Sequence, residues 1–230
     1  MGHEIEAAAQ ARGHEVVAKL DTAGDWDAFS ENIRMADAVF EFSLPGTVIE
    51  NIRRCFDLHL PVIIGTTGWN DRAGEVKKWC LEEGQAVFAA SNFSIGVNML
   101  YRITASLAEM INKLEDYQIS LEEIHHIHKL DAPSGTAINI AEIILDKVER
   151  KKAWVNRPAG SPEELPVISV REGEIPGIHT ITCESDTEKL ILRHEAKGRK
   201  GLALGAVLAA EWLQGKKGYY GMSDMLRFNQ

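Results

Sequence analysis

Hydrophobic positions in the first ninety residues form short apolar runs separated by amphipathic stretches. The runs predict strands over residues 14–20, 38–42, 61–64 and 86–89. The stretches between them predict helices over 3–12, from Pro45-Gly46 to about Cys55, and over about 71–83. Short apolar strands that alternate with helices are typical of a parallel sheet with crossover helices. We therefore predict an α/β domain here.

The pattern changes near Gly96. Helical spacing predicts helices over about 97–113, 136–150 and 202–214, with a tail to Gln230. Alternation predicts strands over 117–124, 167–171, 177–184 and 189–195, with a proline-containing loop over 156–166. These later strands are expected to form an antiparallel sheet in a second, α+β domain. We place the first domain at 1–96, completed by 206–230, and the second at 97–205.

Composition excludes several classes of partner. The formal net charge of −9 argues against nucleic acid or an anionic membrane surface. Cys55, Cys80 and Cys183 lack C-x-x-C spacing, which is typical of reduced thiols in the cytosol. No run of about 18 apolar residues predicts a membrane span, and the start lacks the pattern of a signal peptide. A cytoplasmic protein is expected, and an anionic ligand would need a local basic patch.

The N-terminus resembles the second half of a dinucleotide-binding fingerprint. Gly2 opens a helix of small residues, and Asp21 follows the next predicted strand at the separation expected for a ribose-binding carboxylate. The first strand and the first two glycines of that fingerprint are not in the sequence. We expect that roughly ten residues are missing at this end, so that the pyrophosphate site is incomplete. An ordinary helix start with Asp21 on the surface is the alternative.

Two further segments are candidates for cofactor contacts. Gly65-Thr66-Thr67-Gly68 and Ala90-Ser91-Asn92-Phe93 each follow a predicted strand. Ligands of open α/β sheets bind at the carboxyl ends of the strands. Glycines permit close backbone approach there, and hydroxyl groups can hydrogen-bond a cofactor, although any strand-to-helix turn favours the same residue types.

The segment from His125 to Ala137 has the most unusual composition in the chain. Three imidazoles and Lys129 lie within five residues, and Pro133-Ser134-Gly135-Thr136 then opens a helix. Histidine and lysine are suited to proton transfer, and helix N-termini bind anions. A metal site with His126, His128 and Asp131 and a solvated polar loop are the alternatives. We favour an acid/base and anion-binding site without a metal.

The basic run from Arg193 to Lys200 also has two interpretations. Such runs are usually solvated, but this one leads from a strand into a helix. Arg199 could therefore lie near a bound carboxylate or cofactor.

The motif Glu123–Ala137 resembles the signature of the 4-hydroxy-tetrahydrodipicolinate reductase family of lysine and diaminopimelate biosynthesis. The similarity extends through the segments 65–68, 91–98 and 169–173 to Gly201 and the helix that follows. It implies a Rossmann-like domain, a central α+β domain and a homotetramer. It also implies reduction of a cyclic dicarboxylate imine by NADH or NADPH.

The resemblance further implies roles for individual residues. His125 would be the catalytic histidine and Lys129 the proton donor. The substrate carboxylates would contact His126, Ser134, Gly135 and Thr136. The cofactor would contact Gly2, Asp21, Gly65, Thr66, Thr67, Ala90, Ser91, Asn92, Phe93 and Arg199.

Asp21 is followed by Thr22, where the family often has a basic residue for the phosphate of NADPH, so NADH is expected to be preferred. Two other hypotheses stay open from the sequence. One is another nicotinamide-dependent oxidoreductase on the same scaffold, such as an amino-acid dehydrogenase. The other is a truncated, non-catalytic form.

Overall fold

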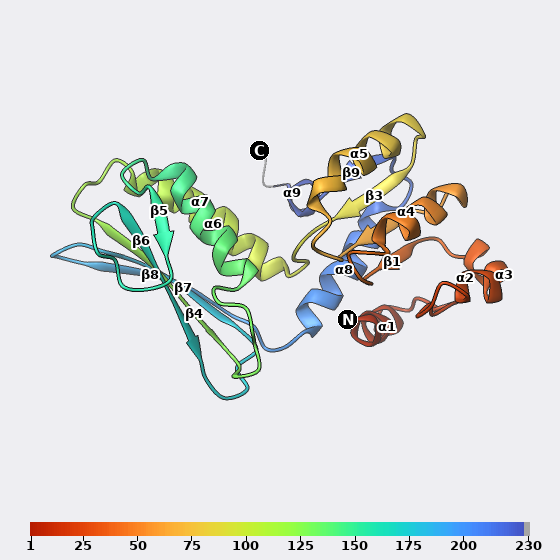
Figure 1. Ribbon diagram of the computed structural model, residues 1–230, viewed down its shortest axis with the longest axis horizontal. Helices are drawn as coiled ribbons and strands as arrows, with labels where there is room; N and C mark the ends of the chain where they lie inside the picture. Colours follow the sequence, from red (N-terminus) through yellow and green to blue (C-terminus); the bar gives the residue numbers. More distant parts are fainter. Residues whose placement is uncertain (228–230) are drawn as a thin grey trace. The chain divides into compact units, whose positions relative to one another are not determined.

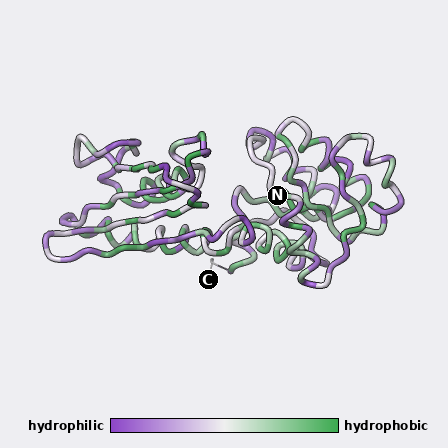
Figure 2. The backbone as a smooth tube through the Cα atoms, turned by 90° about the horizontal axis from the view of Figure 1, so that it is seen from below, coloured by the Kyte–Doolittle hydropathy of each residue, from purple (hydrophilic) through white to green (hydrophobic). Residues whose placement is uncertain are grey.

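The computed structural model describes residues 1–227 and divides the chain into two compact units (Figure 1). Met1–Ser94 and the chain from Lys200 onward form the first unit, and Ile95–Arg199 form the second. Hydrophobic and hydrophilic stretches alternate along the chain in both units (Figure 2). No helix among residues 1–227 combines the length and the apolarity needed to cross a bilayer.

The first unit contains the predicted parallel sheet. Its strands are β1 (Val39–Glu41), β2 (Val62–Ile64), β3 (Ala86–Ala89) and β9 (Gly218–Tyr220). Their order is β1-β2-β3-β9, and each neighbouring pair is parallel. The sequence did not predict β9, because its two tyrosines are too short an apolar run to distinguish from a turn.

Helices pack against both faces of this sheet. They are α1 (Gly2–Ala11), α2 (Asp25–Ala28), α3 (Ser30–Arg34), α4 (Val48–Asp57), the short 3₁₀ helix η1 (Asn70–Arg72), α5 (Ala73–Glu82), α8 (Lys200–Leu213) and α9 (Met222–Met225). Buried residues of α4 and α5 form one core with Val62, Ile64 and Val87. Phe88 alternates to the other face, where its ring lies edge-on to Trp212 of α8 with centroids 6.0 Å apart.

The strand predicted over residues 14–20 is wrong: this segment is irregular. A strand requires a hydrogen-bonding neighbour, and the sheet of the described residues offers this segment none. Glu211 of α8 instead contacts the chain at the start of this segment. Its carboxylate accepts hydrogen bonds from Arg12 at 2.6 and 2.7 Å and lies 2.8 Å from His14 Nε2.

The second unit is built around β4 (Gln118–His125). The other strands are β5 (Ala153–Val155), β6 (Glu164–Arg171), β7 (Ile178–Glu184) and β8 (Lys189–Glu195), in the order β5-β6-β4-β7-β8. The predicted antiparallel sheet is a mixed one, because β4 and β5 each pair with β6 in parallel. The chain passes through a helix between β4 and β6, and such a crossover returns it in the same direction.

Two helices, α6 (Ile95–Ile111) and α7 (Gly135–Lys147), form the core of the second unit with this sheet (Figure 1). Ile140 and Ile144 of α7 are fully buried in a cluster with residues of β4, β6 and β7. Along β4, Ile119, Leu121, Glu123 and His125 are buried, whereas the residues between them are more exposed. Alternation along the strand therefore places Glu123 and His125 on the same face as the apolar core.

One close contact in the first unit generates a stability prediction. A Cβ built on Gly205 of α8 would lie 1.8 Å from the carbonyl oxygen of Phe93, whereas a Cβ on Gly201 of the same helix would meet nothing within 4 Å. We expect Gly205→Ala to destabilise the protein by about 1–3 kcal/mol through overpacking. Gly201→Ala is the matched control and should be neutral or stabilising by up to about 1 kcal/mol. Chemical denaturation of both variants is the measurement, and equal effects would contradict the contact.

Candidate active site

The polar cluster of the second unit follows from the register of three strands. Glu123 of β4 is paired with His179 of β7 on one side and with Ser169 of β6 on the other. His125, two residues further along β4, is paired with Arg171 of β6. Side chains two residues apart share a face of the sheet. The register therefore gathers one carboxylate, two imidazoles and a guanidinium near the carboxyl end of β4.

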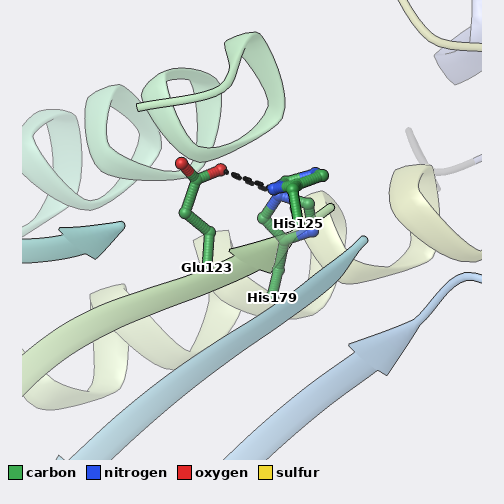
Figure 3. A group of neighbouring side chains, drawn as sticks. All are labelled: Glu123, His125 and His179. Carbon is green, nitrogen blue, oxygen red and sulfur yellow. Dashed lines mark ion pairs between the residues drawn. The ribbon is translucent and has the colours of Figure 1, made fainter. Parts of the chain in front are cut away.

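Glu123 is at the centre of this cluster and has no exposed surface. Its Oε2 lies 3.2 Å from Nδ1 of His125 and 3.9 Å from Nε2 of His179 (Figure 3). Its Oε1 accepts a hydrogen bond of 3.1 Å from Arg171. The backbone N–H of Ser134 donates to both oxygens, at 3.0 and 3.1 Å. One buried carboxylate thus connects two strands with the start of α7.

The contacts around Glu123 determine its charge state. Burial alone would raise the pKa of Glu123, but the neighbouring donor groups of His125, Ser134, Ser169 and Arg171 outweigh burial and hold the pKa well below its usual range. The pKa of His179 is shifted in the direction that favours the neutral imidazole. Burial, assisted by the nearby His125, lowers the pKa of His179 to about 4. At neutral pH the cluster therefore contains an anionic Glu123 beside a neutral His179.

The start of α7 offers an anion-binding geometry. Ser134 is the N-cap, and its hydroxyl accepts a 3.2 Å hydrogen bond from the N–H of Ala137. The same hydroxyl lies 3.2 Å from Nε2 of His179. Gly135 and Thr136 begin the helix, and its first turn contains no acidic residue. The positive end of the helix dipole is therefore not neutralised by a side chain of its own first turn.

Lys129 lies in the turn that follows β4. Its Nζ is 2.7 and 2.9 Å from the two carboxylate oxygens of Asp131, and this contact lowers the pKa of Asp131. Arg171 holds the same turn through the backbone. It donates to the carbonyl of Asp131 at 2.6 Å and, more weakly, to that of Lys129 at 3.4 Å. Arg171 therefore contacts both Glu123 and the turn that carries Lys129.

Two of the three metal ligands considered from the sequence form ion pairs with other residues. His128 pairs with Glu174 at 3.0 Å on the surface, and Asp131 pairs with Lys129. His126 stacks loosely on His128, with ring centroids 5.9 Å apart. A different group, Glu123 with His125 and His179, has donor atoms within 4.8 Å of one another. Glu123 in this group already accepts hydrogen bonds from Arg171 and Ser134.

Sequence reasoning named His125, Lys129 and Ser134 but assigned no role to Glu123, Arg171 or His179. A signal for Glu123 was present: it is a charged residue on the face of β4 that otherwise carries Ile119 and Leu121. Arg171 and His179 come from strands more than forty residues away in the sequence. Only the pairing of β4 with β6 and β7 brings them to the site.

A cavity of about 390 Å³ lies away from this cluster, on the opposite face of the sheet. Ser120, Glu122, Thr180 and Thr182 contribute to its lining, and these positions alternate with the buried ones. The chemistry of Glu123 and His125 is therefore not directed into this cavity.

In the first unit, the predicted cofactor loops meet at the carboxyl ends of β2 and β3. Gly65 follows β2, and a Cβ on it would lie 2.1 Å from the ring of Phe42, so only glycine fits. Thr66 donates a 2.5 Å hydrogen bond to the buried Glu41, and its hydroxyl accepts from the N–H of Ser43 at 2.8 Å. Thr67 is exposed beside it. A second buried carboxylate thus fixes the shape of this loop.

The segment Ala90–Phe93 leaves β3 at the same edge of the sheet. Ala90 is partly buried, Ser91 is exposed, and Asn92 accepts a 2.9 Å hydrogen bond from the N–H of Ser94. The ring of Phe93 is buried, with centroids 5.6 Å from that of Phe42 and 5.8 Å from that of Phe88. Phe93 therefore contributes its ring to the core of the first unit.

The remaining cofactor candidates lie in turns and at helix ends. Gly2 begins α1, and the residue before it makes no side-chain cap. The N–H groups of Asp21 and Thr22 donate to Asp25 at 2.8 and 2.7 Å, which orders that turn. Arg199 is exposed at the end of the second unit.

The residues of the first unit fit a dinucleotide. Small and hydroxyl-bearing residues end two adjacent parallel strands, and the uncapped N-terminus of α1 is suited to a phosphate group. The second unit places imidazole and ammonium groups near a helix N-terminus, a combination suited to proton transfer and to binding an anion. A doubly wound α/β unit combined with such a centre defines the class of nicotinamide-dependent oxidoreductases.

Comparison with known proteins identifies the family within this class. The family pattern "Dihydrodipicolinate reductase, N-terminus" matches residues 1–93, and "Dihydrodipicolinate reductase, C-terminus" matches residues 96–226. The chain therefore belongs to the dihydrodipicolinate reductase family. Members of this family use NADH or NADPH in lysine and diaminopimelate biosynthesis, so the family expected from the sequence is confirmed.

Individual relatives agree with this assignment. The chain is 43% identical to the 4-hydroxy-tetrahydrodipicolinate reductase of Christiangramia forsetii over 98% of the chain and 93% of the relative. It is 36% identical to the same enzyme of Neisseria gonorrhoeae over 86% of the chain and 75% of the relative. The fold matches a dipicolinate-bound dihydrodipicolinate reductase of Paenisporosarcina with a TM-score of 0.79. That match has 22% identity and covers 97% of the chain and 94% of the other.

The neutral His179 predicts a pH dependence of stability. Its pKa is about 4 in the folded protein and 6.5 in an unpaired histidine, so between these values the unfolded chain binds more protons. Stability therefore falls as the pH is lowered from about 6.5 to 4, by up to about 3 kcal/mol from this group. His179→Gln should flatten this part of the profile of unfolding free energy against pH.

The exposed His128 provides the matched control, and His128→Gln should leave the profile unchanged. Chemical denaturation at pH 7 and pH 5 compares the three proteins. An equally steep profile in His179→Gln and in the parent protein would contradict a neutral, buried His179.

Proposed function

We propose that this chain catalyses the NAD(P)H-dependent reduction of 4-hydroxy-tetrahydrodipicolinate to tetrahydrodipicolinate. The observation that carries the proposal is the convergence of His125, the Lys129 turn and the start of α7 around the buried Glu123. Proton transfer and carboxylate binding are the two tasks that a cyclic dicarboxylate imine imposes. Both sets of groups lie at one end of the second unit.

Lys129 and His125 are the groups that we assign to proton transfer. Lys129 carries an ammonium group beside Asp131, and its side chain is only 22% exposed. This position supports its role as the proton donor to the reduced substrate. His125 is 7% exposed and lies beside an anionic carboxylate, so the orientation of its ring is fixed.

The start of α7 is the proposed binding site for the substrate carboxylates. Ser134, Gly135 and Thr136 form the N-terminal turn, where backbone amides and the helix dipole favour an anion. His126 lies in the adjoining turn. Held at this turn, a carboxylate would fix the substrate ring relative to the proton donors.

The proposed cofactor residues remain those of the first unit, together with Arg199. Gly2 would approach the pyrophosphate and Asp21 the adenosine ribose. The loops with Gly65, Thr66 and Thr67 and with Ala90, Ser91, Asn92 and Phe93 would contact the nicotinamide half. When bound, the reduced nicotinamide supplies the hydride. The first unit is accordingly the dinucleotide-binding domain, and the second is the substrate-binding and oligomerisation domain.

A homotetramer and a cytoplasmic location complete the proposal. The second unit supports assembly through its sheet, because Leu190 and Ile191 of the edge strand β8 are 52% and 55% exposed. Apolar residues at an open sheet edge are usually covered in the assembled protein.

Lys129→Ala tests the proton donor. We expect turnover to fall by about 10²–10⁴-fold, the usual effect of losing a general acid, with the fold intact. Lys113→Ala removes an exposed lysine of the same unit and should leave turnover unchanged. NADH oxidation in the presence of enzymatically generated substrate is the measurement. Near-normal turnover in Lys129→Ala would remove Lys129 from this role, and no turnover in the parent chain would refute the proposed function.

Thr22→Arg tests the position of the adenosine ribose. Asp25 holds the backbone of this turn, so the exposed side chain at position 22 can be changed without disturbing it. A new pairing with the NADPH phosphate, worth about 1.5–3 kcal/mol, should raise the ratio of kcat/KM for NADPH over NADH by about tenfold or more. Thr22→Gln, which adds length without charge, is the control. An unchanged ratio in Thr22→Arg would place the ribose elsewhere.

A further inference from the structure

We propose that Glu123 is a positioning residue that orients His125, the first turn of α7 and, through Arg171, the turn that carries Lys129. This inference rests on the proposed function. It assigns a role to a residue that is not itself expected to touch the substrate.

The first step is the contact with His125. Nδ1 of the imidazole lies 3.2 Å from Glu123 Oε2, and both side chains are buried (Figure 3). The contact is close but is not aligned as a hydrogen bond. Because an ionised carboxylate can only accept, its proximity favours the tautomer with the proton on Nδ1. Nε2 is then the nitrogen left for chemistry. It lies beside Gly177, where a Cβ would come within 2.9 Å, so the glycine leaves space for Nε2.

The second step is the contact with α7. The N–H of Ser134 donates to both oxygens of Glu123, at 3.0 and 3.1 Å. Ser134 is the N-cap, so its position sets where the helix begins. Glu123 therefore places the amides of Gly135 and Thr136 relative to the imidazole of His125.

The third step runs through Arg171. Nη2 of the Arg171 guanidinium lies 3.1 Å from Glu123 Oε1 and 2.6 Å from the carbonyl oxygen of Asp131. Arg171 Nε also lies 3.4 Å from the carbonyl oxygen of Lys129. A single bridging group thus links the carboxylate to the backbone beside the proton donor.

These three steps explain why a carboxylate is buried here. A charge without exposed surface is costly unless several donors surround it, and each donor to Glu123 belongs to a different part of the site. Glu123→Gln keeps the size of the side chain but removes the charge. The variant therefore separates positioning by the anion from simple filling of space.

The first test is a direct measurement of the His125 tautomer. Nitrogen-15 NMR of histidine-labelled protein should show a fixed Nδ1–H tautomer for His125, with the signal assigned by a His125→Gln variant. In Glu123→Gln the fixed tautomer should be lost. Glu122→Gln, an exposed neighbour on the other face of β4, is the matched control and should match the parent protein. This measurement does not depend on the identity of the substrate.

The second test is kinetic. We expect Glu123→Gln to lower kcat by about 10²-fold, as misplacement of catalytic groups does, while the KM for NADH stays near that of Glu122→Gln. The melting temperature should fall, because Arg171 loses its anionic partner. Arg171→Met should lower kcat as well, and the double variant should lose less than the product of the two single effects. An unchanged His125 tautomer, or a normal kcat in Glu123→Gln, would overturn the positioning role. Absence of activity in the parent chain would instead refute the proposed function. The positioning role of Glu123 would then be tested by the His125 tautomer alone.

Discussion

The ionised Glu123 is the constraint around which the second unit is organised. Removing a carboxylate from water costs several kcal/mol even after relaxation, and only well-placed donors offset that cost. Its donors come from β6, from the end of β4 and from the N-cap of α7. None of these elements can shift without leaving charge or polar groups uncompensated. The precision of the site is therefore a consequence of the energetics of a buried charge.

The first unit uses the same device at its own sheet edge. Glu41, at the end of β1, is almost fully buried and accepts hydrogen bonds from Thr66, Ser43 and Asn51. These donors belong to the loop after β2, the loop after β1 and helix α4. In each unit, a carboxylate at or near the carboxyl end of a strand holds several chain segments together.

The longer helices and most strands could be predicted because their apolar residues recur with the period of the element, whereas the short helices α2, α3 and α9 were not predicted. Elements that depend on a partner could not. β5 and β9 are defined by their pairing with β6 and β3. Residues 14–20 have a strand-like composition but no neighbouring strand. The mixed sheet was missed because the direction of β6 is set by the crossover through α7, which local alternation does not encode.

The residues of the candidate site also fall into those that the sequence could identify and those that depend on strand pairing. His125, Lys129 and Ser134 occur in one segment and could be identified by their residue types. Arg171 and His179 reach Glu123 only through the register of β4 with β6 and β7. The sequence shows a charged residue on an apolar strand face at position 123, but it does not show which groups compensate its charge.

The chain has a net charge of −9, so an anionic substrate depends on local positive groups that are not already paired. The guanidinium of Arg171 is committed to Glu123 and to the carbonyl of Asp131, and His179 is neutral at physiological pH. The ion pair of Lys129 is different, because Asp131 is 59% exposed and such pairs are weak. Lys129 can therefore leave Asp131 at little cost, as the proposed proton donor would have to do. Under the proposed function, the start of α7 would hold the substrate carboxylates, and Lys129 would remain available as the proton donor.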